Sequence, residues 1–138
     1  MKNISVLLVE DSESVVDTVQ CILFKYKPTK QNLPDIEFTL SVAKSFESAY
    51  RFKNIKFDLV LLDDRLPQKD SDPKNRFGNY IDTAPRGYQL IKSFKESGAY
   101  VVGTSSESTT ADYDTNWNKS GISAWEDLLK ILIFVSSK

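Results

Sequence analysis

Three short apolar runs, each closed by acidic or hydroxyl residues, constrain the fold of this chain more than any other feature of its sequence. Residues 4–9, 57–62 and 100–103 are rich in Val, Leu and Ile, and nearly continuous apolar runs of this length are typical of strands buried on both faces. Segments with apolar residues at helical spacing lie between and after these runs. They cover residues 12–26, 45–53 and 87–97 and a last stretch that opens at Ser123. Strands that alternate with helices in this way form a parallel sheet with helices on both faces.

Two weaker strands complete the predicted sheet. Residues 36–42 alternate apolar and polar side chains, which favours a strand near an edge, and residues 117–119 are predicted to close a short last strand. Residues 28–34 are predicted to be a polar connection, Gly98 to cap the end of helix 87–97, and Ser123 to open a capping box. The predicted fold is therefore α/β, a flavodoxin-like doubly wound sheet of five parallel strands.

The amino-acid composition excludes several kinds of binding partner and catalytic site. The 138 residues fit one domain, and the net charge of −1 gives no reason to expect binding to nucleic acid or to an anionic membrane surface. No apolar run approaches the roughly 20 residues that span a bilayer, and the N-terminus does not resemble a signal peptide. The single cysteine, Cys21, suits a reducing cytosol, so we expect a cytoplasmic protein. The absence of histidine excludes Ser-His-Asp triads, Cys-His pairs and imidazole metal sites.

Acidic, hydroxyl and lysine residues follow the predicted strands. Because ligands of doubly wound sheets bind outside the carboxyl ends of the strands, these side chains are expected to meet at one rim. The set is Glu10 and Asp11, Asp63 and Asp64, Thr104, Ser105 and Ser106, and Lys119. Clustered carboxylates repel one another unless a cation joins them, and Mg²⁺ suits carboxylates, waters and phosphate oxygens. An aspartate can also accept a phosphoryl group covalently.

The segments that carry these residues resemble the receiver domains of bacterial two-component response regulators, the CheY-like family. The matching stretches are residues 6–11, 57–67 and 101–106 together with Lys119, and the resemblance covers nearly the whole chain. The most specific part is an apolar strand that ends in Asp63, with Pro67 four residues later. The resemblance implies a sheet with strand order 2-1-3-4-5 and one receiver domain over residues 1–138.

The resemblance also implies a role for each site residue. Asp63 would be the phosphoacceptor, and Glu10, Asp11 and Asp63 would hold Mg²⁺ together with the backbone carbonyl of Arg65. Ser105 would supply the hydroxyl that turns toward the phosphoryl group, with Lys119 as its ion-pairing partner. Thr104 competes with Ser105 for the hydroxyl role. Arg65 and Glu107 would flank the water that hydrolyses the acyl phosphate, and would thereby tune its lifetime.

The sequence departs from the family pattern in four places. An inserted loop, residues 68–86, separates Pro67 from the next helix, and only 14 positions join Ser105 to Lys119, so the family's fourth helix is predicted to be shortened or absent. Asn116 stands where the family has its aromatic switch residue, and Ser120 stands where a proline usually follows the lysine.

These observations predict a signalling switch that is phosphorylated on Asp63 by a sensor histidine kinase or a phosphotransfer protein. Its output would be altered binding to an unidentified downstream protein, without direct contact to nucleic acid or membrane, as a monomer or weak dimer. It would not be an enzyme beyond self-catalysed phosphotransfer and dephosphorylation. Two alternatives are a pseudo-receiver that binds proteins without phosphorylation and a phosphatase of the haloacid-dehalogenase type. The phosphatase usually needs a second aspartate where Arg65 stands.

Overall fold

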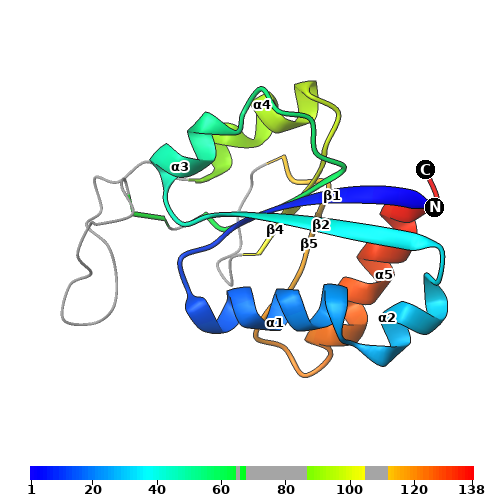
Figure 1. The fold of residues 1–138 in the computed structure, drawn as a ribbon. Helices are drawn as coiled ribbons and strands as arrows, with labels where there is room; N and C mark the ends of the chain where they lie inside the picture. The colour runs from blue at the N-terminus through cyan, green and yellow to red at the C-terminus, as the bar shows by residue number, and fades with distance from the viewer. Residues whose placement is uncertain (65, 68–86, 105–111) are drawn as a thin grey trace.

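A single five-stranded sheet organises the chain. The computed structural model describes residues 1–64, 66–67, 87–104 and 112–138 (Figure 1). The strands are β1 (Lys2–Val9), β2 (Ile36–Ala43), β3 (Leu59–Leu62), β4 (Tyr100–Gly103) and β5 (Thr115–Asn116). They pair in parallel in the order β2-β1-β3-β4-β5. The predicted flavodoxin-like sheet and its strand order are therefore confirmed.

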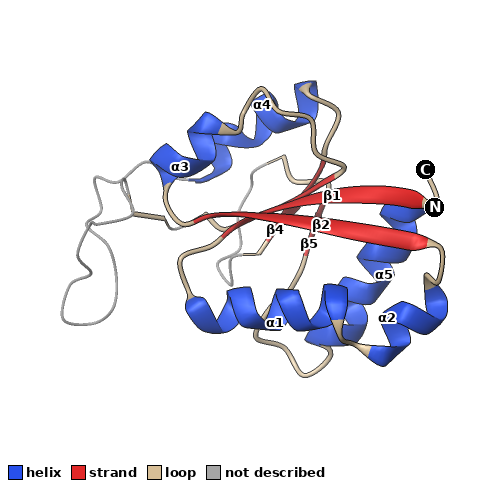
Figure 2. Ribbon diagram, in the orientation of Figure 1, coloured by secondary structure: helices blue, strands red, loops and turns tan. Residues whose placement is uncertain are grey.

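Helices cover both faces of this sheet, as Figure 2 shows. They are α1 (Glu13–Phe24), α2 (Lys27–Asn32), α3 (Phe46–Arg51), the 3₁₀ helix η1 (Gly87–Leu90), α4 (Ile91–Glu96) and α5 (Ala124–Ser136). Helices α1, α2 and α5 lie on one face, and α3 and α4 lie on the other (Figure 1). Apolar side chains alternate along each strand, so each face has its own core. Leu8, Leu61 and Val102 belong to the α1/α5 core, whereas Val9 and Leu62 belong to the α3/α4 core.

Two predicted connections differ from the structure. The predicted polar connection over residues 28–34 is wrong, because helix α2 begins at Lys27 and has Pro28 in its first turn. Proline is tolerated there because its missing N–H would have no helical partner. The last strand consists of residues 115–116 and ends just before residues 117–119, which were predicted to close it; the ring of Trp117 packs in the α1/α5 core.

The start of α5 also differs from the prediction. Ser123 is the N-cap residue, but it makes no side-chain cap hydrogen bond, and its φ of −97° and ψ of 20° differ from the extended backbone that such caps adopt. Trp125 has helical spacing to Leu128 and Leu132 in the sequence, yet it is 38% exposed. Its ring instead packs edge-on against Tyr26, at 5.1 Å between ring centres.

The connection between β4 and β5, where the family's fourth helix is predicted to be shortened or absent, is described only at its two ends. Its described residues, Thr104 and 112–114, contain no helical residue. Tyr113 packs against β4 at Gly103, where an added Cβ would lie 2.7 Å from the tyrosine ring. The inserted loop predicted over residues 68–86 lies outside the described residues. Within the described part of the chain, no helix has the length and apolar character needed to cross a bilayer.

Candidate functional site at the carboxyl rim of the sheet

Strand register brings the candidate residues to one rim. Val9, Leu62, Gly103 and Asn116 stand in one row across β1, β3, β4 and β5. The next residue along each chain segment therefore lies at the carboxyl end of the sheet. These next residues are Glu10, Asp63, Thr104 and Trp117. The register explains why groups distant in sequence converge.

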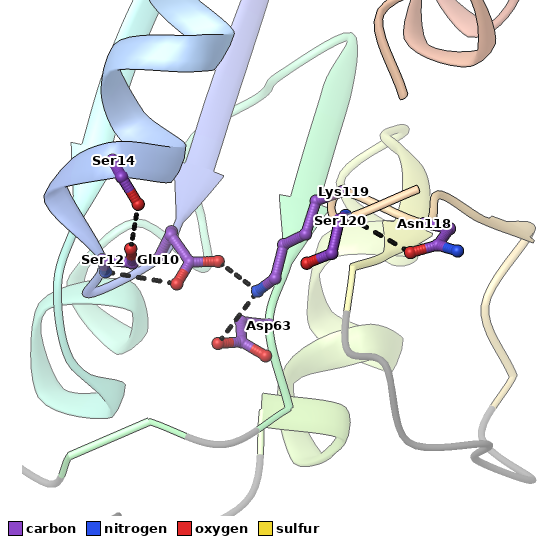
Figure 3. A network of polar contacts seen from close by, with 7 residues as sticks. All are labelled: Glu10, Ser12, Ser14, Asp63, Asn118, Lys119 and Ser120. Carbon is purple, nitrogen blue, oxygen red and sulfur yellow. Dashed lines mark hydrogen bonds and ion pairs between the residues drawn. The ribbon is translucent and has the colours of Figure 1, made fainter. Parts of the chain in front are cut away.

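A lysine joins two carboxylates at this rim (Figure 3). The Nζ of Lys119 lies 2.5 Å from Oε2 of Glu10 and 3.4 Å from Oδ2 of Asp63. The three side chains are only 15%, 2% and 10% exposed, respectively. The other carboxylate oxygen of Glu10 accepts a hydrogen bond from the backbone N–H of Ser12. Because these charges are largely shielded from water, their interactions are stronger than those of a surface ion pair.

Three carboxylates can converge on a cation here. Glu10, Asp11 and Asp63 each offer an oxygen, and these oxygens all lie within 4.8 Å of one another. We call these three residues the acidic rim. Oxygen donors of this type are the preferred ligands of hard divalent ions such as Mg²⁺. The donor set therefore fits the expected metal, and the backbone carbonyl predicted as a further ligand, that of Arg65, lies outside the described residues.

The electrostatics of the rim also favour a cation. Burial and, next, the neighbouring Asp63 carboxylate raise the pKa of Glu10 from its ordinary 4.5 to about 7, against the opposing effect of Lys119. Burial lowers the pKa of Lys119, but the charges of Asp63 and Glu10 outweigh it, so this pKa is raised overall. One ammonium group thus compensates the buried carboxylates only in part.

The sequence-predicted residues divide into two groups. Glu10, Asp11, Asp63 and Lys119 come together as expected from the strand ends, and their individual roles stay predictions. Ser105, Arg65 and Glu107 lie outside the described residues. Asp64 is also buried beside the rim, at 1% exposure.

Two features were missed by sequence reasoning. The side chain of Thr104 is 1% exposed, and its hydroxyl has no hydrogen-bond partner among the described residues. Trp117 is 1% exposed and lies opposite Thr104 in the row of strand ends. The only sequence signal for the second feature was the position of Trp117 two residues before Lys119.

Comparison with known proteins adds structural relatives. No protein-family model and no curated protein sequence matches this chain. A CheY-like response regulator receiver domain protein from Methanospirillum hungatei JF-1 superposes with a TM-score of 0.62 and 20% identity, over 99% of this chain and 96% of the other. A LuxR-family two-component response regulator from Aurantimonas sp. SI85-9A1 gives a TM-score of 0.64 and 15% identity, over 99% and 88%.

A third solved structure is the Mn(2+)-bound form of response regulator Rcp1, with a TM-score of 0.60 and 19% identity over 96% of this chain and 91% of that one. At sequence identities of 15–20%, these structural similarities establish the fold alone. The chemistry of the site has to be argued from the residues of this chain. The observed strand order is the one that the resemblance to receiver domains implies, and the three solved structures match 96–99% of this chain. Over nearly its whole length, this chain has the CheY-like receiver-domain fold of the response regulators.

Proposed function

We propose that this chain is a phosphorylation-dependent signalling switch in which Asp63 accepts a phosphoryl group. The observation that carries the proposal is the placement of Lys119 against both Glu10 and Asp63, beside a third carboxylate, Asp11. A buried carboxylate next to an ammonium group and a cation site has what phosphoryl transfer needs, which is positioning and neutralisation of negative charge.

The transfer would proceed in line from a phosphohistidine of a sensor kinase or a phosphotransfer protein. A carboxylate oxygen of Asp63 forms the new bond to phosphorus, while the bond from phosphorus to the donor nitrogen breaks and its electron pair returns to the imidazole. Lys119, already 3.4 Å from Asp63, stabilises the transferred oxygens. Attack of water on the acyl phosphate later restores the free carboxylate, with Arg65 and Glu107 as the residues expected to tune that step.

Magnesium is the cation that the rim would hold. Glu10, Asp11, Asp63 and the backbone carbonyl of Arg65 would bind it. When bound, Mg²⁺ neutralises negative charge on the oxygens of the phosphoryl group. The remaining parts of the proposal are a cytoplasmic location, an output through altered binding to another protein, and no catalytic turnover of an external substrate.

Intact-mass spectrometry after incubation with Mg²⁺ and acetyl phosphate tests the proposal. The unmodified protein should gain the mass of one phosphoryl group, and hydroxylamine, which cleaves acyl phosphates, should remove it. Asp63→Asn should gain no mass. Asp64→Asn changes the adjacent buried carboxylate and should still be labelled, so it is the matched control.

Two outcomes would refute the proposal. Labelling that persists in Asp63→Asn would place the phosphoryl group elsewhere. A wild-type protein that takes no label at saturating Mg²⁺ would favour the alternative of a receiver-like binding module that acts without phosphorylation.

A further inference from the structure

A cavity of about 290 Å³ lies between the end of α1, helix α2 and the start of β2. We call it the α2 cavity, because one of its walls is helix α2, which stands where a polar connection was predicted. Helix α2 lies at the end of the sheet where the chain begins (Figure 1). Strand β2 runs from Ile36 at this cavity to Ala43, which pairs with Val9 beside the acidic rim. Seven steps of about 3.3 Å along the strand put the two ends roughly 23 Å apart, so the cavity is separate from the acidic rim.

The floor of the α2 cavity is apolar and rests on the α1/α5 core. Leu23 and Phe38 line the cavity and are themselves members of that core, at 4% and 8% exposure. Leu33 and Ile36 line it at the junction of α2 and β2, where the backbone N–H of Ile36 donates to the carbonyl of Leu33. Sites for small molecules have this composition, a largely apolar lining with a few placed polar groups. The volume is near the lower limit for such sites, so the occupant has to be small.

Helix α2 is held in place at both of its ends. Its N-cap residue, Tyr26, packs edge-on against Trp125 of α5, and the Tyr26 hydroxyl donates to a carboxylate oxygen of Glu126 at 3.4 Å. At the other end, the backbone N–H of Leu33 donates to the carbonyl of Thr29. The wall of the α2 cavity therefore exists before anything binds. A preformed site loses less free energy to ordering when a ligand enters it.

Thr29 brings a buried hydroxyl to this wall. Its side chain lines the cavity and is 2% exposed, and its hydroxyl has no hydrogen-bond partner among the described residues. A helical threonine can donate to the carbonyl four residues earlier, as Thr18 of α1 does to Ser14 at 2.9 Å. For Thr29 that residue is Lys25, which precedes the extended backbone of Tyr26 and lies outside α2. Buried hydroxyls are usually paired, so an acceptor atom on an occupant would supply the partner that Thr29 lacks.

The charge beside this hydroxyl is positive. Lys30 follows Thr29 and also lines the cavity; it is solvent-exposed and takes part in no ion pair with another residue that the structure describes. Glu37 lines the cavity as well, but side chains alternate along a strand, so its carboxylate faces the side of the sheet opposite to Phe38. A hydroxyl and an ammonium group both donate hydrogen bonds, and such bonds are stronger when the acceptor is charged. The polar side of the cavity therefore suits a carboxylate.

We propose that the α2 cavity binds a small carboxylate with a short apolar body. The carboxylate accepts a hydrogen bond from the hydroxyl of Thr29, which rotates about χ1 to meet it, and pairs with the ammonium group of Lys30. The apolar body covers Leu23 and Phe38. The site goes beyond the proposed function and does not rest on it, because it shares no residue with the acidic rim. The chain would thus have a small-molecule ligand in addition to the phosphoryl group.

Titration of the full chain with hexanoate, followed by two-dimensional amide NMR in EDTA, tests this proposal. Amide signals from residues 23–38 should shift along a saturable curve, with a dissociation constant of about 1 mM or below for so small a ligand. Hexanamide has the same body but no charge, and should bind about fivefold more weakly. Acetate has the charge but little apolar body, and should bind more than about tenfold more weakly. Because EDTA keeps metal from the acidic rim, this result and phosphoryl labelling of Asp63 can fail independently of each other.

Substitutions at the two polar residues assign the contacts. Thr29→Val keeps the shape of the side chain but removes the hydroxyl, and should weaken hexanoate binding about tenfold, as expected for one lost hydrogen bond to a charged group. Thr29→Ser keeps the hydroxyl and should bind nearly as well as the wild type. Lys30→Gln should weaken hexanoate about two- to fivefold and leave hexanamide unaffected. Its matched control is Lys27→Gln, an exposed lysine of the same helix that does not line the cavity, which should change neither.

Several results would overturn the proposal. They are the absence of a saturable response to hexanoate, shifts confined to the acidic rim, and equal binding of hexanoate and hexanamide by the wild type. Equal weakening by Lys30→Gln and Lys27→Gln would also overturn it, since general charge attraction would then suffice. If Thr29→Val does not fold, Lys30→Gln decides the outcome: loss of the preference for hexanoate over hexanamide supports the site, and an unchanged preference refutes it.

Discussion

Replacement of Glu10 by glutamine should remove a specific pH dependence from the stability of the magnesium-free protein. In the folded chain the carboxyl of Glu10 is 1% exposed and stands beside Asp63, and its pKa is raised from 4.5 to about 7. The folded state therefore holds a proton on Glu10 over a pH range in which the unfolded chain has released it. Glutamine resembles the protonated side chain and does not titrate.

The sign and size of the effect follow from proton linkage. A group whose pKa is raised on folding contributes stability that is complete below its unfolded pKa and is lost as the pH rises through its folded pKa. The loss from Glu10 therefore falls between pH 4.5 and about 7. A difference of one unit between the folded and unfolded pKa is worth about 1.4 kcal/mol. The raised pKa of Glu10 therefore lowers the free energy of unfolding by about 3 kcal/mol once the pH exceeds 7.

Urea unfolding of the wild type and of Glu10→Gln at pH 4.5 and pH 7.5, with EDTA present, measures this quantity. Between pH 4.5 and pH 7.5, the free energy of unfolding of the wild type should fall by about 3 kcal/mol more than that of the variant. Added Mg²⁺ should restore stability to the wild type at pH 7.5 and much less at pH 4.5, because its carboxylate ligands must be ionised to bind it. If the two proteins have parallel pH profiles in EDTA, the assigned environment of Glu10 is wrong.

Three further changes follow from the same contacts. Lys119→Met leaves the buried carboxylates of the acidic rim without their ammonium partner, and should lower the free energy of unfolding by about 3 kcal/mol at pH 7.5. The control Lys92→Met changes a lysine whose side chain is 87% exposed, and should alter the free energy of unfolding by less than about 1 kcal/mol; equal effects in urea titrations would contradict the burial argument. Gly103→Ala places a methyl group 2.7 Å from the ring of Tyr113, and should cost about 1–3 kcal/mol; an unchanged melting temperature would be inconsistent with that contact. Thr104→Val removes an unsatisfied hydroxyl and should stabilise the unmodified protein by about 1 kcal/mol, whereas a comparable loss would show that the hydroxyl is bonded in the resting state.

Local sequence patterns were sufficient for the parallel sheet and for the acidic rim. Continuous apolar runs could be read as buried strands because both faces of β1, β3 and β4 are covered. Once the strands are parallel, their carboxyl ends share one edge, so the meeting of Glu10, Asp63 and Lys119 follows from topology. This meeting could be predicted from the order of strands and helices along the chain, without knowledge of side-chain packing.

Tertiary packing decided the remaining features, because they depend on contacts between residues distant in sequence. Trp117 follows the last strand, Thr115–Asn116, and its ring packs in the α1/α5 core, a placement that its sequence neighbours alone do not indicate. Burial of Glu10 and the missing partner of Thr104 are likewise properties of the assembled sheet. A sequence states which polar groups reach the rim; only the folded chain determines how far water is excluded from them, and that exclusion sets their charge state and their need for a partner.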